Sequence, residues 1–409
     1  MKVKAFSGLV PSPGNAERIA SVPYDVVNTA EARALAAGNP DSFLHVVRAE
    51  IDFPEGTDPF GEEIYQKSKE NFSALQEKSL LVREPEPCVY LYRQIMDGHS
   101  QIGITLVCHI DDYEEGLIKK HEKTRPDKEN DRTRLTDVLS ANTGPVFLTY
   151  EEQSEIDAFV ENWTTANQAE IDFVDPVGVQ HTVWRITEAE AAPILDCLEQ
   201  VPASYVADGH HRSASAHRVG SERRRANESH DGSEGYNWFL AVLFPARQLR
   251  VLAYNRVVRD LNGQTAAEVL QKLETVVEVI PDGQKVPRDP ESVSMYLAGS
   301  WYSLRWTIET DNPIDRLDVS FLQDQILSPI LGVGDPRTDK RIDFVGGIRG
   351  TDELEKRVDS GEWEVAFSMY PTTVQQLMDI ADAGEIMPPK STWFEPKLRS
   401  GLFVYTLDD

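Results

Sequence analysis

The chain has 409 residues, of which 40% are hydrophobic and 27% are charged, and its formal net charge at pH 7 is −27. These proportions are typical of a globular protein with a sizeable core, and the acidity argues against nucleic-acid binding, which needs an electropositive surface. No apolar run approaches the roughly 20 residues of a membrane helix, and the first twenty residues, interrupted by Pro11 and Pro13, do not resemble a secretory signal.

Residues 1–222 are predicted to form an N-terminal α+β domain. The helices and strands expected there, in chain order, are the helices Thr29–Gly38 and Phe60–Lys78, the strands Val89–Arg93, Ile102–His109 and Gly144–Tyr150, and the helix Ala189–Gln200. The polar segment "GSERRRANESHDGSEGYN" (220–237) follows, without helical or strand periodicity. We interpret it as a mobile loop and as the domain boundary.

Residues 235–409 are predicted to form a second, C-terminal α+β domain. It opens on the apolar runs "WFLAVLF" and "LRVLAYNRVV", whose short proline-containing connection predicts a hairpin. Helices are expected at Thr265–Val276 and near Asp318–Leu331, with strands around Tyr302–Ile308 between them. The end, "STWFEPKLRSGLFVYTL", reads as extended. Neither G-x-G-x-x-G after a strand nor G-x-x-x-x-G-K-[ST] occurs, which disfavours the two commonest nucleotide-binding folds.

The stretch "YVADGHHRSASAHR" from Tyr205 onward predicts a strand, a glycine turn and a helix start. Free backbone N–H groups and the positive end of the helix dipole meet at such a point and favour an anion. Asp208 could orient a histidine, Gly209 admits a ligand close to the backbone, and His210, His211 and Arg212 are further candidate ligand-binding residues. The alternative interpretation is an ordinary helix start with Asp208 as its cap.

The segment "KKHEKTRPDKENDRTR" (119–134) is locally basic, with seven cationic and four anionic residues in an otherwise acidic chain. A polyphosphate site needs such an excess, because negative charge must be neutralised while the reacting group is held. Its candidate site residues are Lys120, His121, Glu122, Lys123 and Arg125. The alternative is a solvated loop with internal salt bridges.

Three further segments carry candidate residues. In "SVPYDV" (21–26), Pro23 forces an extended conformation on Val22, so Asp25 lies on a rigid turn as a possible base or as a cap. In "ANTGPVF" (141–147), Asn142 and Thr143 could hold an oxyanion or could make a turn. The proline-rich "GEIMPPKSTWFEPK" (384–397) is a substrate-side loop or a strand lead-in.

Other catalytic classes lack their motifs. A Ser-His-Asp hydrolase is not predicted, because no G-x-S-x-G elbow occurs. Zinc hydrolases are disfavoured by the absence of H-E-x-x-H and H-x-H spacing. Asp208 and Asp25 could each ligate a metal, but no residue is assigned as a metal ligand. The chain has three cysteines, which are widely spaced and predict neither a disulfide framework nor a cysteine zinc site. We expect a cytoplasmic protein with no membrane partner, and its oligomeric state stays open.

In this order, "SVPYDV", "KKHEKT", "ANTGPVFLTY", "VADGHHRSASA" and "PPKSTWFEPKLRSGL" closely resemble a bacterial and archaeal family called domain of unknown function 1015. The resemblance extends from Lys4 to Leu407, with one departure, since Val22 stands where the family usually has a second proline. The family name itself implies no activity.

The shorter motif "DGHHR" also resembles the phosphate-binding motif of free-serine kinases in the ParB and sulfiredoxin-like superfamily. This resemblance implies a ParB/sulfiredoxin-like element at the motif, with Asp208–Arg212 holding the phosphates of a nucleotide or of pyrophosphate. The resemblance supports a site and not a reaction, and from that site we predict a small-molecule kinase that phosphorylates free serine or a similar hydroxy compound.

In that kinase, Mg²⁺ would accompany ATP, ADP or pyrophosphate as donor. The basic segment would neutralise the transferred charge, and Asp25 or Glu122 would be the base. Two alternatives remain: a nucleotide-binding switch without catalysis, and a phosphatase acting on the same phospho-compound.

Overall fold

The computed structural model describes residues 1–408 and divides into two compact units. Unit 1 comprises Met1–Leu249 together with the segment from Pro396 onward, and unit 2 comprises Arg250–Glu395. Both units combine helices with mixed or antiparallel sheets, so the predicted α+β class is confirmed. None of the described helices has the length and apolar character needed to cross a membrane.

Unit 1 is built on a nine-stranded mixed sheet in the order β6-β11-β8-β12-β5-β4-β10-β9, with β1 also pairing with β5. Its strands are β1 (Val3–Lys4), β4 (Cys88–Met96), β5 (His99–His109), β6 (Ile118–Lys119), β8 (Val146–Tyr150), β9 (Ile171–Val174), β10 (Gln180–Thr187), β11 (Ser204–Asp208) and β12 (Trp238–Pro245). The central strands β8 and β12 are almost continuous apolar runs and are buried along nearly their whole length. Strands with this pattern need cover on both faces of the sheet.

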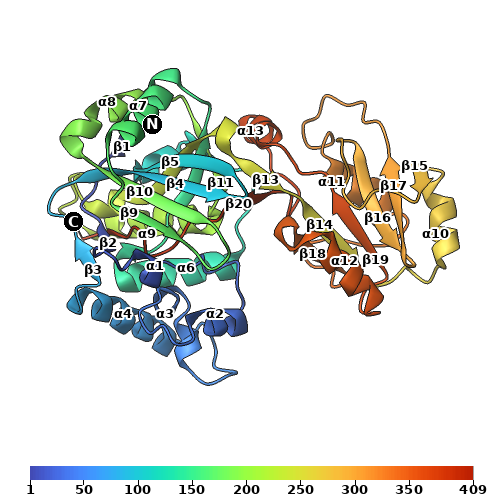
Figure 1. Ribbon diagram of the computed structural model, residues 1–409, viewed down its shortest axis with the longest axis horizontal. Helices are drawn as coiled ribbons and strands as arrows, with labels where there is room; N and C mark the ends of the chain where they lie inside the picture. Colours follow the sequence, from blue (N-terminus) through green and yellow to red (C-terminus); the bar gives the residue numbers. More distant parts are fainter. Residues whose placement is uncertain (409) are drawn as a thin grey trace. The chain divides into compact units, whose positions relative to one another are not determined.

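Figure 1 shows α7 and α8 on one side of the sheet and α2, α3, α4 and α6 on the other. Residues of α7, α8 and α9 share one apolar core with the strands of the sheet, whereas α2, α3, α4 and α6 share a second core. The helices of unit 1 are α1 (Ala16–Ile19), α2 (Thr29–Ala36), α3 (Leu44–Val47), α4 (Glu62–Glu77), α5 (Ile110–Glu114), α6 (Pro126–Leu139), α7 (Ser154–Ala166), α8 (Glu188–Glu199) and α9 (His210–Ala226). Helix α6 begins inside the basic segment, where Pro126 occupies the first turn.

The division between the units differs from the one expected at residues 222–235. Helix α9 continues to Ala226, through much of the segment interpreted as a loop, and β12 lies between β8 and β5 in the sheet of unit 1. The hairpin predicted for β12 and the run after it is therefore wrong. The buried apolar strand β12 pairs with strands that are remote in sequence, which a local turn pattern cannot indicate.

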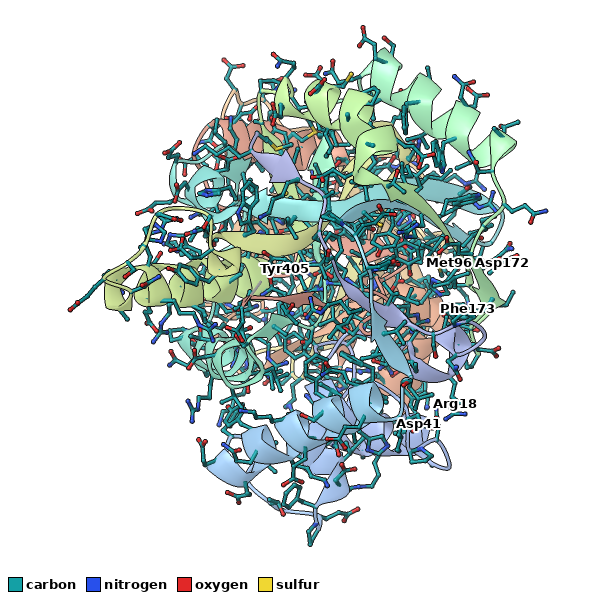
Figure 2. All side chains as sticks on the ribbon, turned by 90° about the vertical axis from the view of Figure 1, so that its left-hand side faces the viewer. Arg18, Asp41, Met96, Asp172, Phe173 and Tyr405 are labelled. Carbon is teal, nitrogen blue, oxygen red and sulfur yellow. The ribbon has the colours of Figure 1, made fainter. Side chains whose placement is uncertain are left out.

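The C-terminal segment returns to unit 1 after unit 2. Strand β21 (Tyr405–Thr406) pairs with β7 (Ala141–Asn142), and the Tyr405 hydroxyl, labelled in Figure 2, donates a hydrogen bond of 2.9 Å to the carbonyl of Gly235. Earlier in the segment, Arg399 forms a buried ion pair with Asp175. The predicted extended end thus consists of short strands and anchored turns.

Unit 2 contains an antiparallel six-stranded sheet in the order β15-β17-β16-β19-β14-β18. Its strands are β14 (Tyr254–Val258), β15 (Glu278–Pro281), β16 (Ser292–Leu297), β17 (Ser300–Arg305), β18 (Ile342–Gly346) and β19 (Val365–Met369). A separate pair joins β13 (Arg250–Leu252) to β20 (Trp393–Glu395). Its helices are α10 (Ala266–Leu273), α11 (Asp318–Phe321), which continues as a π-helix over Leu322–Leu327, α12 (Gly350–Asp359) and α13 (Val374–Asp382).

Candidate phosphate-binding site

Two strands at one edge of the large sheet bring the basic segment and the DGHHR motif together. Strand β6 pairs with β11 in parallel, with Ile118 opposite Ser204 and Lys119 opposite Tyr205. Because parallel strands run in the same direction, the residues that follow them leave the sheet at the same edge. The rings of His121 and His210 consequently lie edge to face with their centroids 4.4 Å apart. Residues of the two motifs therefore lie side by side in the structure.

Gly209 forms the turn between β11 and α9. Its φ is +98°, in the left-handed region, which glycine adopts far more readily than other residues. In the 17-residue helix α9, the first backbone bond is donated by Ser213 to the Gly209 carbonyl, so the N–H groups of the preceding turn have no intrahelical acceptor. These donors and the helix dipole make this end of α9 attractive to an anion.

Replacing Gly209 by alanine is expected to lower the free energy of unfolding and to weaken phosphate binding together. The left-handed conformation costs a non-glycine residue about 1–2 kcal/mol, and a Cβ would lie only 3.0 Å from Nε of Arg212. Gly116→Ala is the matched control, because Gly116 has φ +78° with no atom within 4 Å of the added Cβ. Urea unfolding should show a loss in the free energy of unfolding in both variants. Pyrophosphate titration should show weaker binding in Gly209→Ala alone. Equal pyrophosphate affinity in the two would contradict the placement of the anion.

Asp208 holds two cationic side chains at this point. Its Oδ2 lies 3.3 Å from Nη2 of Arg212 and 3.5 Å from Nζ of Lys397, which comes from the C-terminal segment. Burial by itself would raise the pKa of Asp208, but Lys397 and Arg212 outweigh it and hold the pKa well below its usual range. The carboxylate is therefore ionised at neutral pH and fixes a lysine and an arginine beside the start of α9.

The two histidines behind this turn are buried and neutral. Burial lowers the pKa of His121 to about 4. Burial also lowers the pKa of His210 well below its usual value, and the neighbouring His121 lowers it further. Glu122 adds a half-exposed carboxylate, with Oε2 3.9 Å from Nδ1 of His210. Uncharged imidazoles can accept a hydrogen bond or ligate a metal, whereas imidazolium groups cannot.

Ligand atoms of His121, Glu122 and His210 lie within 4.8 Å of one another. Among the described residues, this is the one cluster of three or more His, Cys, Asp or Glu side chains with convergent ligand atoms. Mg²⁺ prefers oxygen ligands in octahedral geometry, so a set with two imidazoles does not fit the predicted Mg²⁺ as a protein-bound ion.

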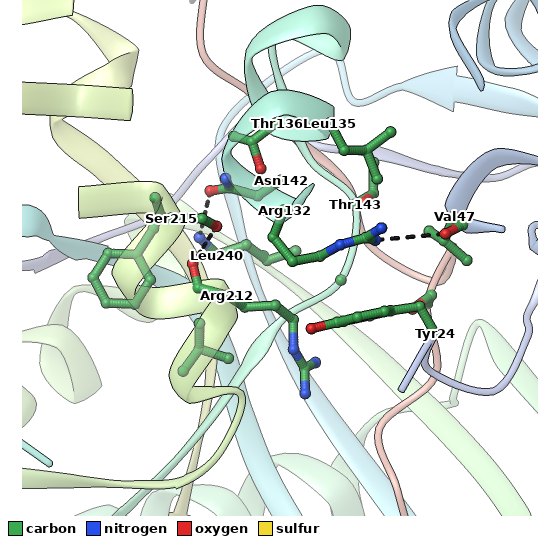
Figure 3. A pocket seen from close by; sticks show the side chains of 15 residues that line it. Tyr24, Val47, Arg132, Leu135, Thr136, Asn142, Thr143, Arg212, Ser215 and Leu240 are labelled. Atoms are coloured by element: carbon green, nitrogen blue, oxygen red, sulfur yellow. Dashed lines mark hydrogen bonds between the residues drawn. The ribbon is translucent and has the colours of Figure 1, made fainter. Parts of the chain in front are cut away.

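A small cavity lies beside α9 (Figure 3), lined by Tyr24, Arg132, Thr143 and Arg212 among other residues. The guanidinium of Arg132 stacks on the Tyr24 ring, 3.9 Å from its centroid, and the Tyr24 side chain extends toward Arg212. Burial raises the pKa of Tyr24, so its phenol stays protonated and can donate a hydrogen bond.

The predicted cations of the basic segment have different positions. Nζ of Lys120 lies 4.3 Å from the ring centroid of Tyr113. The side chain of Arg125 is exposed and pairs with Asp127 at 2.8 Å, although its backbone N–H donates a 3.0 Å hydrogen bond to Nε2 of His211. Lys123 is also exposed. The basic segment therefore contacts the DGHHR motif through the Arg125 backbone N–H and the His121 ring. The side chains of Lys120 and Arg125 contact Tyr113 and Asp127 instead.

The remaining candidates lie at the cavity or next to it. Asn142 and Thr143 both line it, but the side-chain oxygen of Asn142 accepts a 3.1 Å hydrogen bond from the Leu240 backbone, which is a structural role. Asp25 is exposed and follows Tyr24, which lines the cavity while Asp25 does not. Asp25 is therefore next to a lining residue in the chain, but its own side chain does not line the cavity.

Sequence reasoning did not assign Lys397, Arg132 and Tyr24 to the site. All three lie in segments quoted above as carrying candidate residues. For Tyr24, the sequence predicted only a rigid turn. Their meeting depends on tertiary contacts, such as the 2.9 Å hydrogen bond from the Gln94 side chain to the Lys397 carbonyl. Spacing along the chain carries no signal of such contacts.

Several solved structures are similar to this chain. A free serine kinase in complex with AMP has 12% sequence identity and a TM-score of 0.37, over 73% of this chain and 92% of that chain. A conserved hypothetical protein from Pyrococcus furiosus has 14% identity and a TM-score of 0.35, over 72% and 93%. SbnI with a C-terminal truncation, from Staphylococcus aureus, has 11% identity and a TM-score of 0.39, over 71% and 82%. A TM-score below 0.5 does not establish a common fold, so the function proposed below rests on the geometry of the site.

Sequence comparison shows the family directly. No curated protein matches the chain significantly in sequence. The family model described as "Protein of unknown function (DUF1015)" matches residues 3–320, which contain every quoted motif except the last, Pro388–Leu402. Because this match covers well over half of the chain, the protein belongs to the DUF1015 family of proteins of unknown function.

Proposed function

We propose that the protein is a small-molecule kinase that binds the phosphates of a donor at the start of α9 and phosphorylates free serine or a similar hydroxy compound. The donor is ATP, ADP or pyrophosphate. One observation supports the proposal: the parallel pairing of β6 with β11 brings Glu122 and two neutral histidines to the start of a 17-residue helix, where the N–H groups have no acceptor within the helix. The motif resemblance to free-serine kinases points the same way.

Each part of the site has a role in phosphoryl transfer. The N–H groups of His210, His211 and Arg212 would bind donor oxygens, and Lys397 would neutralise charge beside them. A carboxylate, Asp25 or Glu122, would accept the proton of the acceptor hydroxyl as the new O–P bond forms and the donor O–P bond breaks. Because catalysis of this kind depends on positioning and charge, a rigid helix start is a suitable platform.

The direct test is the product. Purified full-length protein incubated with serine, Mg²⁺ and each donor in turn is expected to form phosphoserine, detected by mass spectrometry. The reverse reaction, from phosphoserine with AMP, ADP or inorganic phosphate, should be measured in parallel. Donor binding without phosphoserine formation in either direction would favour the non-catalytic switch, and simple release of phosphate from phosphoserine would favour the phosphatase.

Arg212→Ala is expected to weaken pyrophosphate and ADP binding by about 1.5–3 kcal/mol, or roughly 10- to 150-fold, the value of a charge-assisted hydrogen bond. The Arg212 side chain lies against Gly209 and is largely buried, so it is pre-positioned at the turn. Arg125→Ala removes an arginine that is exposed and paired with Asp127, and it should change affinity little. Isothermal titration of both variants measures the contrast, and unchanged affinity in Arg212→Ala would exclude its contact with the donor.

A further inference from the structure

The cluster of His121, Glu122 and His210 has a chemistry that phosphate binding alone does not require. Two of its members come from different segments of the chain and are both almost completely buried, with exposed fractions of 2% for His121 and 5% for His210. Their rings meet at a centroid separation of 4.4 Å, and Glu122 approaches His210 to 3.9 Å. Two imidazoles and one carboxylate are the ligand set of several open zinc sites.

We propose that His121, Glu122 and His210 bind a divalent transition-metal ion of the Zn²⁺ class and that Mg²⁺ is not the ion held by the protein. Imidazole ligands favour Zn²⁺, Co²⁺ and Ni²⁺, whereas Mg²⁺ takes carboxylates, phosphates and water. The inference goes beyond the proposed kinase function, because metal binding needs neither donor nor acceptor.

The separations between the three ligand atoms are short enough for small side-chain rotations to bring all three onto one ion. With metal–ligand bonds of about 2.0–2.2 Å, the donor atoms of a tetrahedral site lie about 3.4 Å apart. The ligand atoms here lie within 4.8 Å of one another, so a contraction of the cluster brings them into range. Glu122, half-exposed near the start of the basic segment, is the member with most freedom to move.

The surroundings of the histidines suit ligands. A hydrogen bond links the His121 ring to the backbone of Val206, which fixes the ring as outer-shell partners of metal-bound histidines do. Nε2 of His210 is buried and has no hydrogen-bond partner among residues 1–408.

Three protein ligands leave one position of a tetrahedral ion open. His210 is the first residue of α9, so the cluster adjoins the turn whose N–H groups make the helix start attractive to an anion. Open sites of this type bind water or a substrate oxygen at the fourth position. A phosphate or hydroxyl oxygen at the start of α9 would therefore have access to the ion.

The test uses full-length protein stripped with EDTA and titrated without nucleotide. Co²⁺ binding is followed by visible absorption, Zn²⁺ binding by competition with Co²⁺, and Mg²⁺ is added as the oxygen-preferring comparison. We expect one equivalent of Co²⁺ with the spectrum of a four- or five-coordinate site, displacement by Zn²⁺ and no displacement by millimolar Mg²⁺. Glu122→Gln and His210→Ala should lower the affinity by at least the 10–100-fold that loss of an outer-shell partner costs.

His217→Ala is the matched control, because His217 lies on the same helix with its Nε2 3.5 Å from a Glu114 carboxylate oxygen but outside the cluster. It should bind Co²⁺ like the original chain. Thermal unfolding shows whether each variant is folded. If His210→Ala does not fold, because His210 is buried, the comparison rests on Glu122→Gln. Absence of stoichiometric binding, equal affinity in Glu122→Gln, or equal preference for Mg²⁺ would overturn the proposal. Failure to form phosphoserine would leave it intact, since binding is measured without substrates.

Discussion

Asp25→Asn is expected to lower the turnover number for phosphoserine formation by about 100- to 10,000-fold, the usual contribution of a general base. The substitution keeps the size of the side chain and removes only its ability to take a proton. Asp25 is one of two candidate carboxylates, and the metal site would engage the other, Glu122. Asp25 is exposed and follows Tyr24, which lines the cavity together with Arg212.

Donor affinity and Co²⁺ affinity should stay unchanged in Asp25→Asn, because the residue belongs neither to the start of α9 nor to the histidine cluster. Glu122→Gln provides the comparison, with a predicted loss of Co²⁺ affinity. Steady-state kinetics with saturating donor and serine separates the two variants. Full turnover in Asp25→Asn, with loss in Glu122→Gln under saturating metal, would assign the base to Glu122.

Asp175→Asn is expected to lower the free energy of unfolding by about 3–5 kcal/mol, the cost of removing one partner from a buried ion pair. The side chains of Asp175 and Arg399 have exposed fractions of 4% and 9% and form a close ion pair. Asp175 also accepts 3.0 and 2.9 Å hydrogen bonds from the backbone N–H groups of Val177 and Val179. Asparagine keeps an acceptor for those bonds but leaves the buried guanidinium without its counter-charge.

The double variant Asp175→Asn/Arg399→Met identifies the cause. If the unpaired guanidinium is responsible, the double variant should be more stable than Asp175→Asn alone, as urea unfolding would show. Arg399 also lies two residues after Lys397, so Asp175→Asn should weaken pyrophosphate binding by loosening the segment that carries this lysine. A loss of stability below about 1 kcal/mol, the usual value for an exposed pair, would show that the pair is not desolvated in solution.

Local patterns predicted several helices and strands of unit 1, because such patterns depend only on neighbouring residues. The apolar runs of β4, β5 and β8 and the helices α2, α4 and α8 lie where periodicity placed them. The glycine turn before α9 was also predictable, since a left-handed residue between a strand and a helix favours glycine. These features give the anion-attracting helix start without any knowledge of tertiary contacts.

The rest of the site depends on strand pairing, which sequence spacing does not encode. Strand β6 has only two residues, Ile118 and Lys119, and no pattern marks it as a partner of β11. Its parallel pairing nevertheless brings His121 to His210. The same limit explains the hairpin error, because β12 is apolar enough to fill a central position and pairs with β5 and β8. The sequence also could not predict where individual side chains point. Arg125, for example, pairs with Asp127 on the surface and not with a group of the site.

The return of the chain to unit 1 after residue 395 affects the order in which the protein can be completed on the ribosome. Translation delivers β11, Gly209 and α9 first, then all of residues 250–395, and only afterwards Lys397 and Arg399. Until then Asp208 lacks its lysine, Asp175 lacks its counter-charge and β7 lacks its partner strand. A nascent chain paused within unit 2 would thus hold the start of α9 in an incomplete site, which Lys397 and Arg399 can join only after they have left the ribosome.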